Sequence, residues 1–330
     1  MHRRTFLSAS AAALAAGVAC SSQPEAQPEP APQAEAAIPI LDTHVHLYDP
    51  TRPGGVPWPP ETNTLIYKKT LPDRLRQESA GLGVVGAIEV ECSPLLEDNQ
   101  WVLDVIEKDT LMVGTIGDLE PDHPEFAAQL DRFGANPLFL GIRYGYLWGR
   151  DLREALGRPA FVEGVKLLAS RGMTLDTANP SVRALEDVVV LTDKVPDLRV
   201  VLDHLPKLQE PEAGPERAAY ETAMRALGQR PNVYAKVSSV LRKVGDAVPD
   251  DLELYRPKLD EMWGVFGEDR VVYGSDWPNS EPLGPYPKIL SIVQRYASEK
   301  SREAQEKYFW RNSVKAYRWK KRADDQPQGA

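Results

Sequence analysis

The fold is decided by residues 38–46, which read Ile38-Pro39-Ile40-Leu41-Asp42-Thr43-His44-Val45-His46. The apolar run predicts a buried β-strand over 38–43, and side chains two apart on a strand point to the same face. His44 and His46 are therefore expected side by side at the carboxyl end of this strand, with Asp42 one step earlier on the same face. Because histidine is the commonest metal ligand and titrates near neutral pH, the pair predicts a functional site.

Similar apolar runs recur along the chain and alternate with amphipathic segments. The runs are continuously apolar, which is typical of strands that are covered on both faces, as in a parallel sheet. Strands are predicted at Ile38–Thr43, Val84–Val90, Leu111–Gly117, Leu138–Arg143, Met173–Thr177, Arg199–Asp203, Asn232–Val237 and Arg270–Gly274. Helices are predicted between and after them, near 70–80, 97–108, 124–134, 160–170, 180–194, 215–229, 251–267 and 286–299.

This alternation between residues 38 and 322 favours a closed (β/α)8 TIM barrel over an open doubly wound sheet. No Gly-x-Gly-x-x-Gly follows the first strand, which counts against a dinucleotide-binding fold. Aromatic residues at helical spacing in Ser301–Lys320 predict an extra C-terminal helix, which we expect on the barrel exterior. The barrel domain is assigned to 38–322 and a polar tail to 323–330, with fraying expected from Arg322 on.

The first segment differs from the rest. Arg3-Arg4-Thr5-Phe6-Leu7 and the uncharged, Ala-rich run to Ala19 predict an export signal of the twin-arginine type over residues 1–19. Gly17-Val18-Ala19-Cys20 resembles a bacterial lipoprotein cleavage site, in which Cys20 carries the lipid; ordinary cleavage nearby is the alternative. Residues 20–37 predict a disordered tether. We therefore expect a cell-envelope or periplasmic protein that touches the membrane only through this anchor.

The charge and the cysteines restrict the partners further. Cleavage would remove Arg3 and Arg4 and take the formal net charge from −9 to −11, so nothing attracts the body to nucleic acid or anionic lipid. A small-molecule substrate is expected, and the oligomeric state stays open. With Cys20 in the anchor, Cys92 has no disulfide partner and is interpreted as a small buried apolar residue.

Polar residues follow several strands at their carboxyl ends, where the active site of such a barrel lies. Strand six ends in Asp203-His204, and strand eight runs into Gly274-Ser275-Asp276-Trp277-Pro278. His204 and Asp276 are therefore expected to converge on the first two histidines. The long proline-rich loop 47–69, which contains Trp58, predicts a lid or binding loop.

These motifs resemble one family. Asp-Thr-His-Val-His at 42–46, Asp-His-Leu-Pro-Lys at 203–207, Val-Tyr-Ala-Lys-Val-Ser at 233–238 and Gly-Ser-Asp-Trp-Pro at 274–278 look like the amidohydrolase superfamily. They most resemble its amidohydrolase-2 branch, which includes L-fuconolactonase-like and pyrone-dicarboxylate lactonase-like hydrolases. The resemblance covers about residues 38–320 and implies a TIM-type barrel, hydrolysis of lactones or related C–O or C–N bonds, and a general-base role for Asp276.

The ligand set departs from this family in one respect. Mononuclear metal-dependent members use a His on the fifth strand, where this chain has Met173-Thr174-Leu175-Asp176-Thr177, and strand four does not end in the Lys that bridges two metals. A zinc site needs three or four ligands. His44, His46 and Asp276, with His204 or Asp176 nearby, are expected to bind a divalent metal such as zinc weakly or optionally. Metal-independent activity is also consistent, since the resemblance implies that some lactonases of this branch work without metal.

Lactone hydrolysis needs a water activated by a base, a stabilised oxyanion and a proton for the departing alkoxide. Asp276 is assigned as the base. His44, His46 and His204, protonated or holding a metal, are expected to polarise the carbonyl.

Five further residues are candidates for binding the substrate. Arg143 offers a planar fork for carboxylates, although an ion pair in the barrel wall is the alternative. The others are Trp148 and Arg150 in the loop after strand four, Lys236 on strand seven and Glu91 after strand two. Lys236 and Glu91 could instead only pair with neighbouring charges.

We therefore expect a hydrolase that opens the lactone of a sugar acid or a related carboxylated ring. A metal-dependent amide hydrolase or decarboxylase of the same superfamily is an alternative. A non-catalytic solute-binding lipoprotein is an alternative of another class, but a binding protein has no need of a poised base.

Overall fold

The computed structural model describes residues 1–2, 5, 7–12 and 37–328. The chain divides into residues 1–36 and residues 37–330. Most of the expected export signal and tether, including Arg3, Arg4 and Cys20, lies outside the described residues. Within the described part of the chain, no helix is both long enough and apolar enough to cross a membrane.

Eight parallel strands form a single sheet in chain order, which confirms the predicted barrel. The last strand meets the first through two backbone hydrogen bonds: His46 N–H donates to the Trp277 carbonyl at 2.8 Å, and Asp276 N–H donates to the His44 carbonyl at 2.9 Å. The strands are β1 (Ile40–Val45), β2 (Val84–Val90), β3 (Met112–Gly117), β4 (Phe139–Gly145), β5 (Thr174–Ala178), β6 (Arg199–Leu202), β7 (Val233–Val237) and β8 (Val271–Tyr273).

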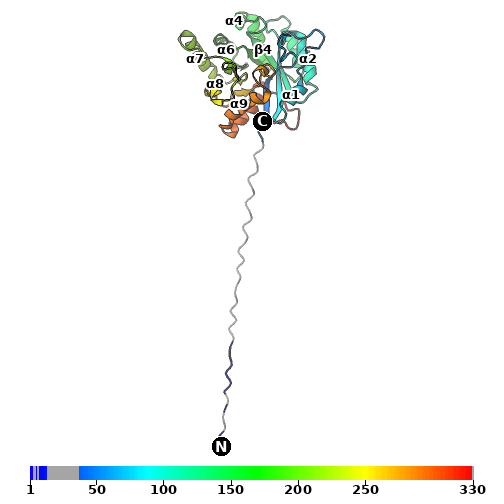
Figure 1. Ribbon diagram of the computed structural model, residues 1–330. Helices are drawn as coiled ribbons and strands as arrows, with labels where there is room; N and C mark the ends of the chain where they lie inside the picture. The colour runs from blue at the N-terminus through cyan, green and yellow to red at the C-terminus, as the bar shows by residue number, and fades with distance from the viewer. Residues whose placement is uncertain (3–4, 6, 13–36, 329–330) are drawn as a thin grey trace. The chain divides into compact units, whose positions relative to one another are not determined.

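The helices surround the strands (Figure 1). Several begin where the sequence supplies a cap: the side chains of Ser181 and Asp251 accept backbone N–H bonds at the starts of α6 and α8. The helices are α1 (Pro72–Glu78), α2 (Leu96–Ile106), α3 (Phe126–Gly134), α4 (Leu152–Leu156), α5 (Pro159–Ser170), α6 (Val182–Lys194), α7 (Gly214–Gly228), α8 (Leu252–Phe266), α9 (Tyr286–Ser298), α10 (Arg302–Glu306) and α11 (Asn312–Tyr317). The short α4 was not predicted, and the other helices of the barrel lie within a few residues of their predicted positions.

The C-terminal segment closes the end of the barrel opposite the strand carboxyl ends. Its first part packs outside, where Tyr308 and Phe309 contact the Tyr273 ring of β8. Its last part enters the barrel core, because Tyr317 and Trp319 belong to the same buried cluster as Leu41 and Val113. The prediction that this segment lies on the exterior is therefore wrong for its last part, since its aromatic rings pack against the inward apolar side chains of the strands.

The tail beyond this plug is held as well. Arg322 donates from its guanidinium to the carbonyls of Ile106 and Asp109, at 2.8 and 3.1 Å. The side chain of Gln326, which is 2% exposed, donates to the carbonyls of Val85 and Thr110. The expected fraying from Arg322 is wrong for residues 322–326, because these side chains satisfy strand and loop carbonyls that would otherwise need water.

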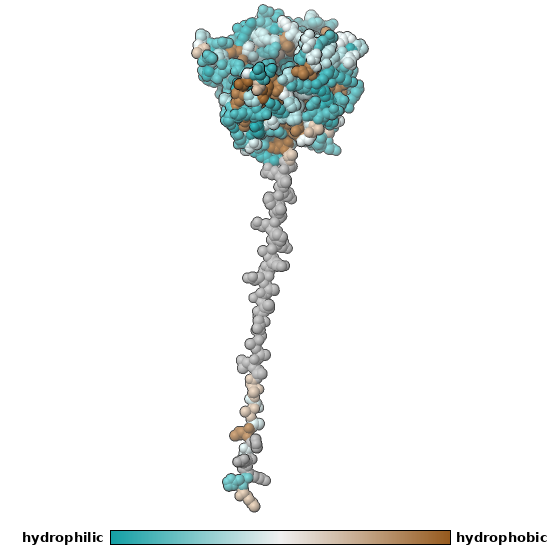
Figure 2. All heavy atoms as spheres, in the orientation of Figure 1, coloured by the Kyte–Doolittle hydropathy of each residue, from teal (hydrophilic) through white to brown (hydrophobic). Residues whose placement is uncertain are grey.

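The surface of the barrel is mostly hydrophilic in the view of Figure 2, with apolar residues in small separate patches. Large apolar side chains that are exposed in the barrel domain include Leu65, Leu95, Val190 and Val244. Single exposed apolar residues of this kind are ordinary on a folded protein.

Candidate active site

Three imidazoles converge on one carboxylate oxygen at the carboxyl ends of the strands. The Nε2 atoms of His44, His46 and His204 lie 3.8, 3.4 and 3.8 Å from Asp276 Oδ1. All four residues are 5% exposed or less. The structure thus brings together the four side chains that the sequence predicted, although they come from β1, the end of β6 and the end of β8.

The local backbone explains how these side chains meet. One extra residue on β1 interrupts its pairing with β2, since Asp42 pairs with Ala87 but Val45 pairs with Glu89. This bulge breaks the alternation of faces. Asp42 therefore does not share a face with the histidine pair: its carboxylate accepts bonds from Ser275 N–H and the Tyr286 hydroxyl of α9, at 2.8 Å each.

The two site residues outside β1 occupy a rare backbone conformation. His204 and Asp276 have positive φ angles of 56° and 61°, which turn their side chains at the point where the strand ends. Gly274 is needed just before Asp276, because a Cβ there would lie 2.8 Å from the His44 Cβ. The close approach of β8 to β1 thus depends on this glycine.

The two oxygens of Asp276 have different surroundings. Oδ2 accepts hydrogen bonds from the Ser239 hydroxyl and from the Asn279 amide, the latter at 2.9 Å. Oδ1 faces the imidazoles and has no hydrogen-bond partner among the described residues. Burial alone would raise the pKa of Asp276, but the three neighbouring imidazoles, His204 first, hold it below its usual range. The carboxylate is therefore ionised and its Oδ1 is free to accept a proton.

Burial has the opposite effect on two of the imidazoles. It lowers the pKa of His44 well below its ordinary value and that of His204 to about 4. These two rings are neutral at neutral pH. The expectation that they polarise the substrate carbonyl in their protonated form is therefore wrong at this pH. Polarisation by these rings must come from a neutral N–H group or from a metal.

The spacing of one donor set allows a single divalent cation. The Nε2 atoms of His44 and His46 and a carboxylate oxygen of Asp276 lie within 4.8 Å of one another. The His46 Nδ1 atom lies 2.7 Å from the Val90 carbonyl oxygen, which only accepts, so His46 Nε2 presents its lone pair to Asp276 Oδ1. Two acceptors that face each other call for a proton or a cation between them.

A second group of possible ligands, His44, Asp203 and His204, is less suited to a metal. Both oxygens of Asp203 are already next to cations, since Lys236 Nζ lies 2.9 Å from Oδ1 and Arg143 Nε lies 3.2 Å from Oδ2. Their proximity holds the pKa of Asp203 well below its usual range despite burial. A metal at this group would meet two positive charges.

A pocket of about 150 Å³ opens above the imidazoles. Its walls combine aromatic side chains with amides, two carboxylates and two cationic groups. The lining residues are His46, Trp58, Glu91, Cys92, Arg143, Leu147, Trp148, Asn179, His204, Lys207, Asp276 and Asn279. The pocket therefore contains three of the predicted substrate-binding residues, Glu91, Arg143 and Trp148.

These three residues form one connected group. Trp148 Nε1 donates to Glu91 Oε2 at 3.0 Å, and Arg143 Nη1 lies 3.8 Å from Glu91 Oε1. Burial raises the pKa of Glu91 to about 7, against the opposing effect of Arg143. Arg143 is thus both a wall ion pair, with Asp203 and Glu91, and a pocket residue, so the two interpretations from sequence hold together.

The other two predicted binding residues do not line this pocket. Arg150 pairs with Asp118 and Glu120 behind the loop. Lys236 is fully buried and lies between Asp176 and Asp203. Both expectations are corrected, because the carboxylates of Asp118 and Asp176 occupy the donors of these side chains. For Lys236 the alternative of pairing with neighbouring charges holds, and Asp176 binds this lysine.

Sequence reasoning missed several residues of the site. Asn179, Lys207 and Asn279 line the pocket, and Ser238 and Ser239 position the catalytic groups, with the Ser238 hydroxyl 2.7 Å from His204 Nδ1. All follow a strand closely, so their position at a carboxyl end was an available signal. Trp58 is the one residue of the predicted lid that reaches the pocket, with its ring 5.4 Å from that of His46.

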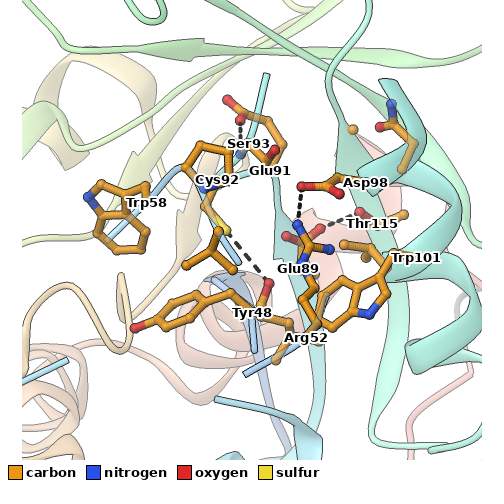
Figure 3. Close-up of a pocket in the computed structure, with 16 residues that line it drawn as sticks. Tyr48, Arg52, Trp58, Glu89, Glu91, Cys92, Ser93, Asp98, Trp101 and Thr115 are labelled. Atoms are coloured by element: carbon orange, nitrogen blue, oxygen red, sulfur yellow. Dashed lines mark hydrogen bonds and ion pairs between the residues drawn. The ribbon is translucent and has the colours of Figure 1, made fainter. Parts of the chain in front are cut away.

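A smaller cavity of about 20 Å³ lies beside the pocket and shares Trp58, Glu91 and Cys92 with it. Figure 3 shows these residues on one side, with the Arg52–Asp98 pair and Trp101 on the other. Burial raises the pKa of the Cys92 thiol well above its usual value, so the thiol is protonated. Cys92 is half-buried and lines both cavities, so its interpretation as a buried apolar residue is wrong in part. The cavity has room for about one water molecule.

Comparison with known proteins agrees with this fold. A family model described as amidohydrolase matches residues 41–319. L-fucono-1,5-lactonase of Burkholderia ambifaria is 28% identical over 74% of this chain and 82% of its own. An amidohydrolase of Burkholderia multivorans, solved with bound zinc, shares the fold with a TM-score of 0.74 at 21% identity, over 85% of this chain and 99% of the other. A probable 2-pyrone-4,6-dicarboxylic acid hydrolase of Acinetobacter baumannii, solved with citric acid, has a TM-score of 0.66 at 18% identity, over 85% and 99%.

Proposed function

The chain belongs to the amidohydrolase family, and from this premise we propose that it hydrolyses a lactone to the corresponding hydroxy acid. The observation that carries the proposal is the convergence of three imidazole Nε2 atoms on Asp276 Oδ1 at the floor of a pocket. The relative from Burkholderia ambifaria, named as a lactonase, supports the choice of a lactone.

The reaction follows from the positions of these groups. A water held between the imidazoles gives a proton to Asp276 Oδ1 while its oxygen bonds to the lactone carbonyl carbon. Imidazole N–H groups next to this point stabilise the negative charge on the carbonyl oxygen. The ring C–O bond then breaks, and the alkoxide takes back the proton from Asp276. Ser239 and Asn279 keep the carboxylate oriented through its other oxygen.

A divalent metal held by His44, His46 and Asp276 would polarise the carbonyl and lower the pKa of its water when bound. The donor set permits this, while the absence of a fifth-strand histidine leaves three protein ligands for one ion. Metal dependence is therefore part of the test below.

The pocket suits a polyhydroxylated ring. Trp58 and Trp148 offer flat apolar faces, whereas Glu91, Asn179 and Asn279 offer acceptors and amides for hydroxyl groups. Arg143 already has two carboxylate neighbours, so a substrate carboxylate would have to compete for it. We therefore favour the neutral lactone of a sugar acid over a dicarboxylated ring.

A lactone panel tests the proposal. Purified protein is assayed by pH-stat against sugar lactones, carboxylated lactones, amides and aromatic carboxylic acids, with and without chelator. Opening of sugar lactones is expected. Turnover restricted to amides, or carbon dioxide release from aromatic acids, would support the amide hydrolase or decarboxylase alternative. Tight lactone binding without product would support a binding protein.

We also propose that the protein is exported and anchored through Cys20. The proposal is supported by Arg3-Arg4 before the apolar run and by the Gly17-Val18-Ala19-Cys20 sequence. Labelling of expressing cells with radioactive palmitate should mark the wild type and not Cys20→Ser. Export without label would indicate simple cleavage, and retention of the whole chain in the cytoplasm would contradict both.

A further inference from the structure

A buried lysine lies directly behind one of the three imidazoles. Lys236 of β7 is 0% exposed, and its ammonium lies 2.6 Å from Asp176 Oδ2, 2.9 Å from Asp203 Oδ1 and 3.2 Å from His44 Nδ1. On a fourth side it lies over the Tyr317 ring, 5.4 Å from the centroid. No reaction step proposed above uses this residue.

The contact between Lys236 and His44 favours one tautomer of the imidazole. An ammonium group has three donors and no acceptor, and Lys236 lies between the carboxyl groups of Asp176 and Asp203. The contact with His44 has hydrogen-bond geometry, so His44 Nδ1 is the acceptor, whereas the contact with Asp203 is an ion pair without that geometry. In a neutral imidazole with an unprotonated Nδ1, the proton is on Nε2. The competing arrangement, in which Nδ1 donates to Asp203 Oδ1, has the longer distance of 3.5 Å and would place two donors against each other.

We propose that Lys236 is a positioning residue that holds His44 in its Nε2–H form and so sets the metal preference of the site. In this form His44 points an N–H group at the reaction centre, where Nε2 has no hydrogen-bond partner among the described residues. It donates to the developing oxyanion and cannot ligate a metal. Only His46 and Asp276 of the donor set then remain, which is fewer than a tight zinc site needs.

Lys236 also blocks the second ligand group. Its ammonium occupies the side of Asp203 where a cation between Asp203 and His44 would lie. The Lys236 ammonium thus takes the place of a metal ion between Asp203 and His44. Its positive charge also weakens metal binding at the neighbouring group of His44, His46 and Asp276. The inference concerns the resting protein and does not depend on which lactone is the substrate.

The direct test is the tautomer of His44. The full chain contains five histidines, so a long-range ¹H–¹⁵N spectrum of metal-stripped protein labelled on histidine is simple to assign, with His44→Gln to identify the signal. The proposal expects an unprotonated Nδ1 and a protonated Nε2 on His44. A protonated Nδ1 would overturn it.

The second test is zinc affinity, measured by competition with a fluorescent chelator. Lys236→Met removes the donors at similar length, so Nδ1 becomes free to donate to Asp203 and Nε2 to bind the ion. Zinc is expected to bind about 10- to 100-fold more tightly, the range by which partners of metal ligands act. Lys166→Met, on an exposed residue of α5, controls for the lost charge and should leave the affinity unchanged.

Lys236→Met also leaves Asp176 without its cation and could fail to fold. The double variant Asp176→Asn/Lys236→Met removes one charge of each sign, and His44 keeps Asp203 as its only charged neighbour on Nδ1. It should show the same gain in affinity and the shifted tautomer. Unchanged zinc affinity and an unchanged His44 tautomer in the variants that fold would overturn the proposal.

Discussion

The two ends of the barrel are built in opposite ways. At the amino-terminal end, Tyr317 and Trp319 fill the interior, and Arg199 and Thr174 both donate to the carbonyl of Ala316, at 2.8 and 2.7 Å. At the carboxyl end, buried polar atoms without hydrogen-bond partners among the described residues include His44 Nε2, Glu91 Oε1 and Asp276 Oδ1. A buried polar atom without a partner costs stability. The comparison indicates that the amino-terminal end stabilises the fold, whereas the carboxyl end carries the catalytic groups at a cost in stability.

The largest expected effect tests the reactive end. Asp276→Asn keeps the size of the side chain and removes the base, so kcat should fall by about 10³-fold while the protein stays folded. Lactone hydrolysis and circular dichroism measure the two properties. Asp246→Asn, at an exposed loop position, is the matched control. Near wild-type turnover of the first variant would show that another group is the base.

The next effect tests the plugged end. Trp319 is buried, and its indole donates to the Ser313 hydroxyl at 2.9 Å. Trp319→Ala should lower the free energy of unfolding by about 3–5 kcal/mol, measured by urea titration. Because Trp319 packs in the apolar cluster with Leu41 and Val113 and does not line the pocket, kcat/KM of the folded protein should stay close to wild type. A large loss of kcat/KM with unchanged stability would contradict the division between the two ends.

The dependence of stability on pH measures how much the buried Glu91 carboxyl destabilises the folded state. Burial raises the pKa of Glu91 from 4.5 to about 7, so the folded state binds this proton more tightly than the unfolded state. The contribution of Glu91 to stability therefore falls as pH rises from about 4.5 to about 7, by at most about 1.4 kcal/mol per pH unit. Glu91→Gln removes this dependence.

Urea midpoints at pH 5 and pH 7.5 measure this effect as the difference between wild type and variant, because Glu89 and Asp176 have pKa values shifted in the same direction and act in both proteins. Glu163→Gln, on the exposed face of α5, should keep the wild-type slope. An equal slope in the Glu91 variant would show that this carboxyl is ionised in the fold.

The smallest effect is expected at the rim. Lys207 lines the pocket but is exposed, and an exposed charge contributes below about 1 kcal/mol. Lys207→Gln should raise KM for a neutral sugar lactone by less than about threefold. A much larger loss for carboxylated lactones than for neutral ones would reverse our preference for the neutral substrate.

The sequence predicted the barrel and the four converging residues because both depend on local patterns. Continuous apolar runs identify buried parallel strands, and a polar residue just after such a run lies at the barrel mouth. The position of Asp42 could not be predicted, since the bulge in β1 changes which residues share a face. The roles of Lys236 and Tyr317 could not be predicted either, because they depend on pairings with Asp176 across the barrel.

The seam between the first and last strands has a consequence for how the enzyme fails. The two amides that close the ring, those of His46 and Asp276, belong to the reacting residues themselves. A local opening between the first and last strands would separate the catalytic residues while the helices are still folded. We therefore expect slow hydrogen–deuterium exchange at these two amides in active protein. A circular permutant whose new termini lie between the first and last strands should remain folded but lose its activity.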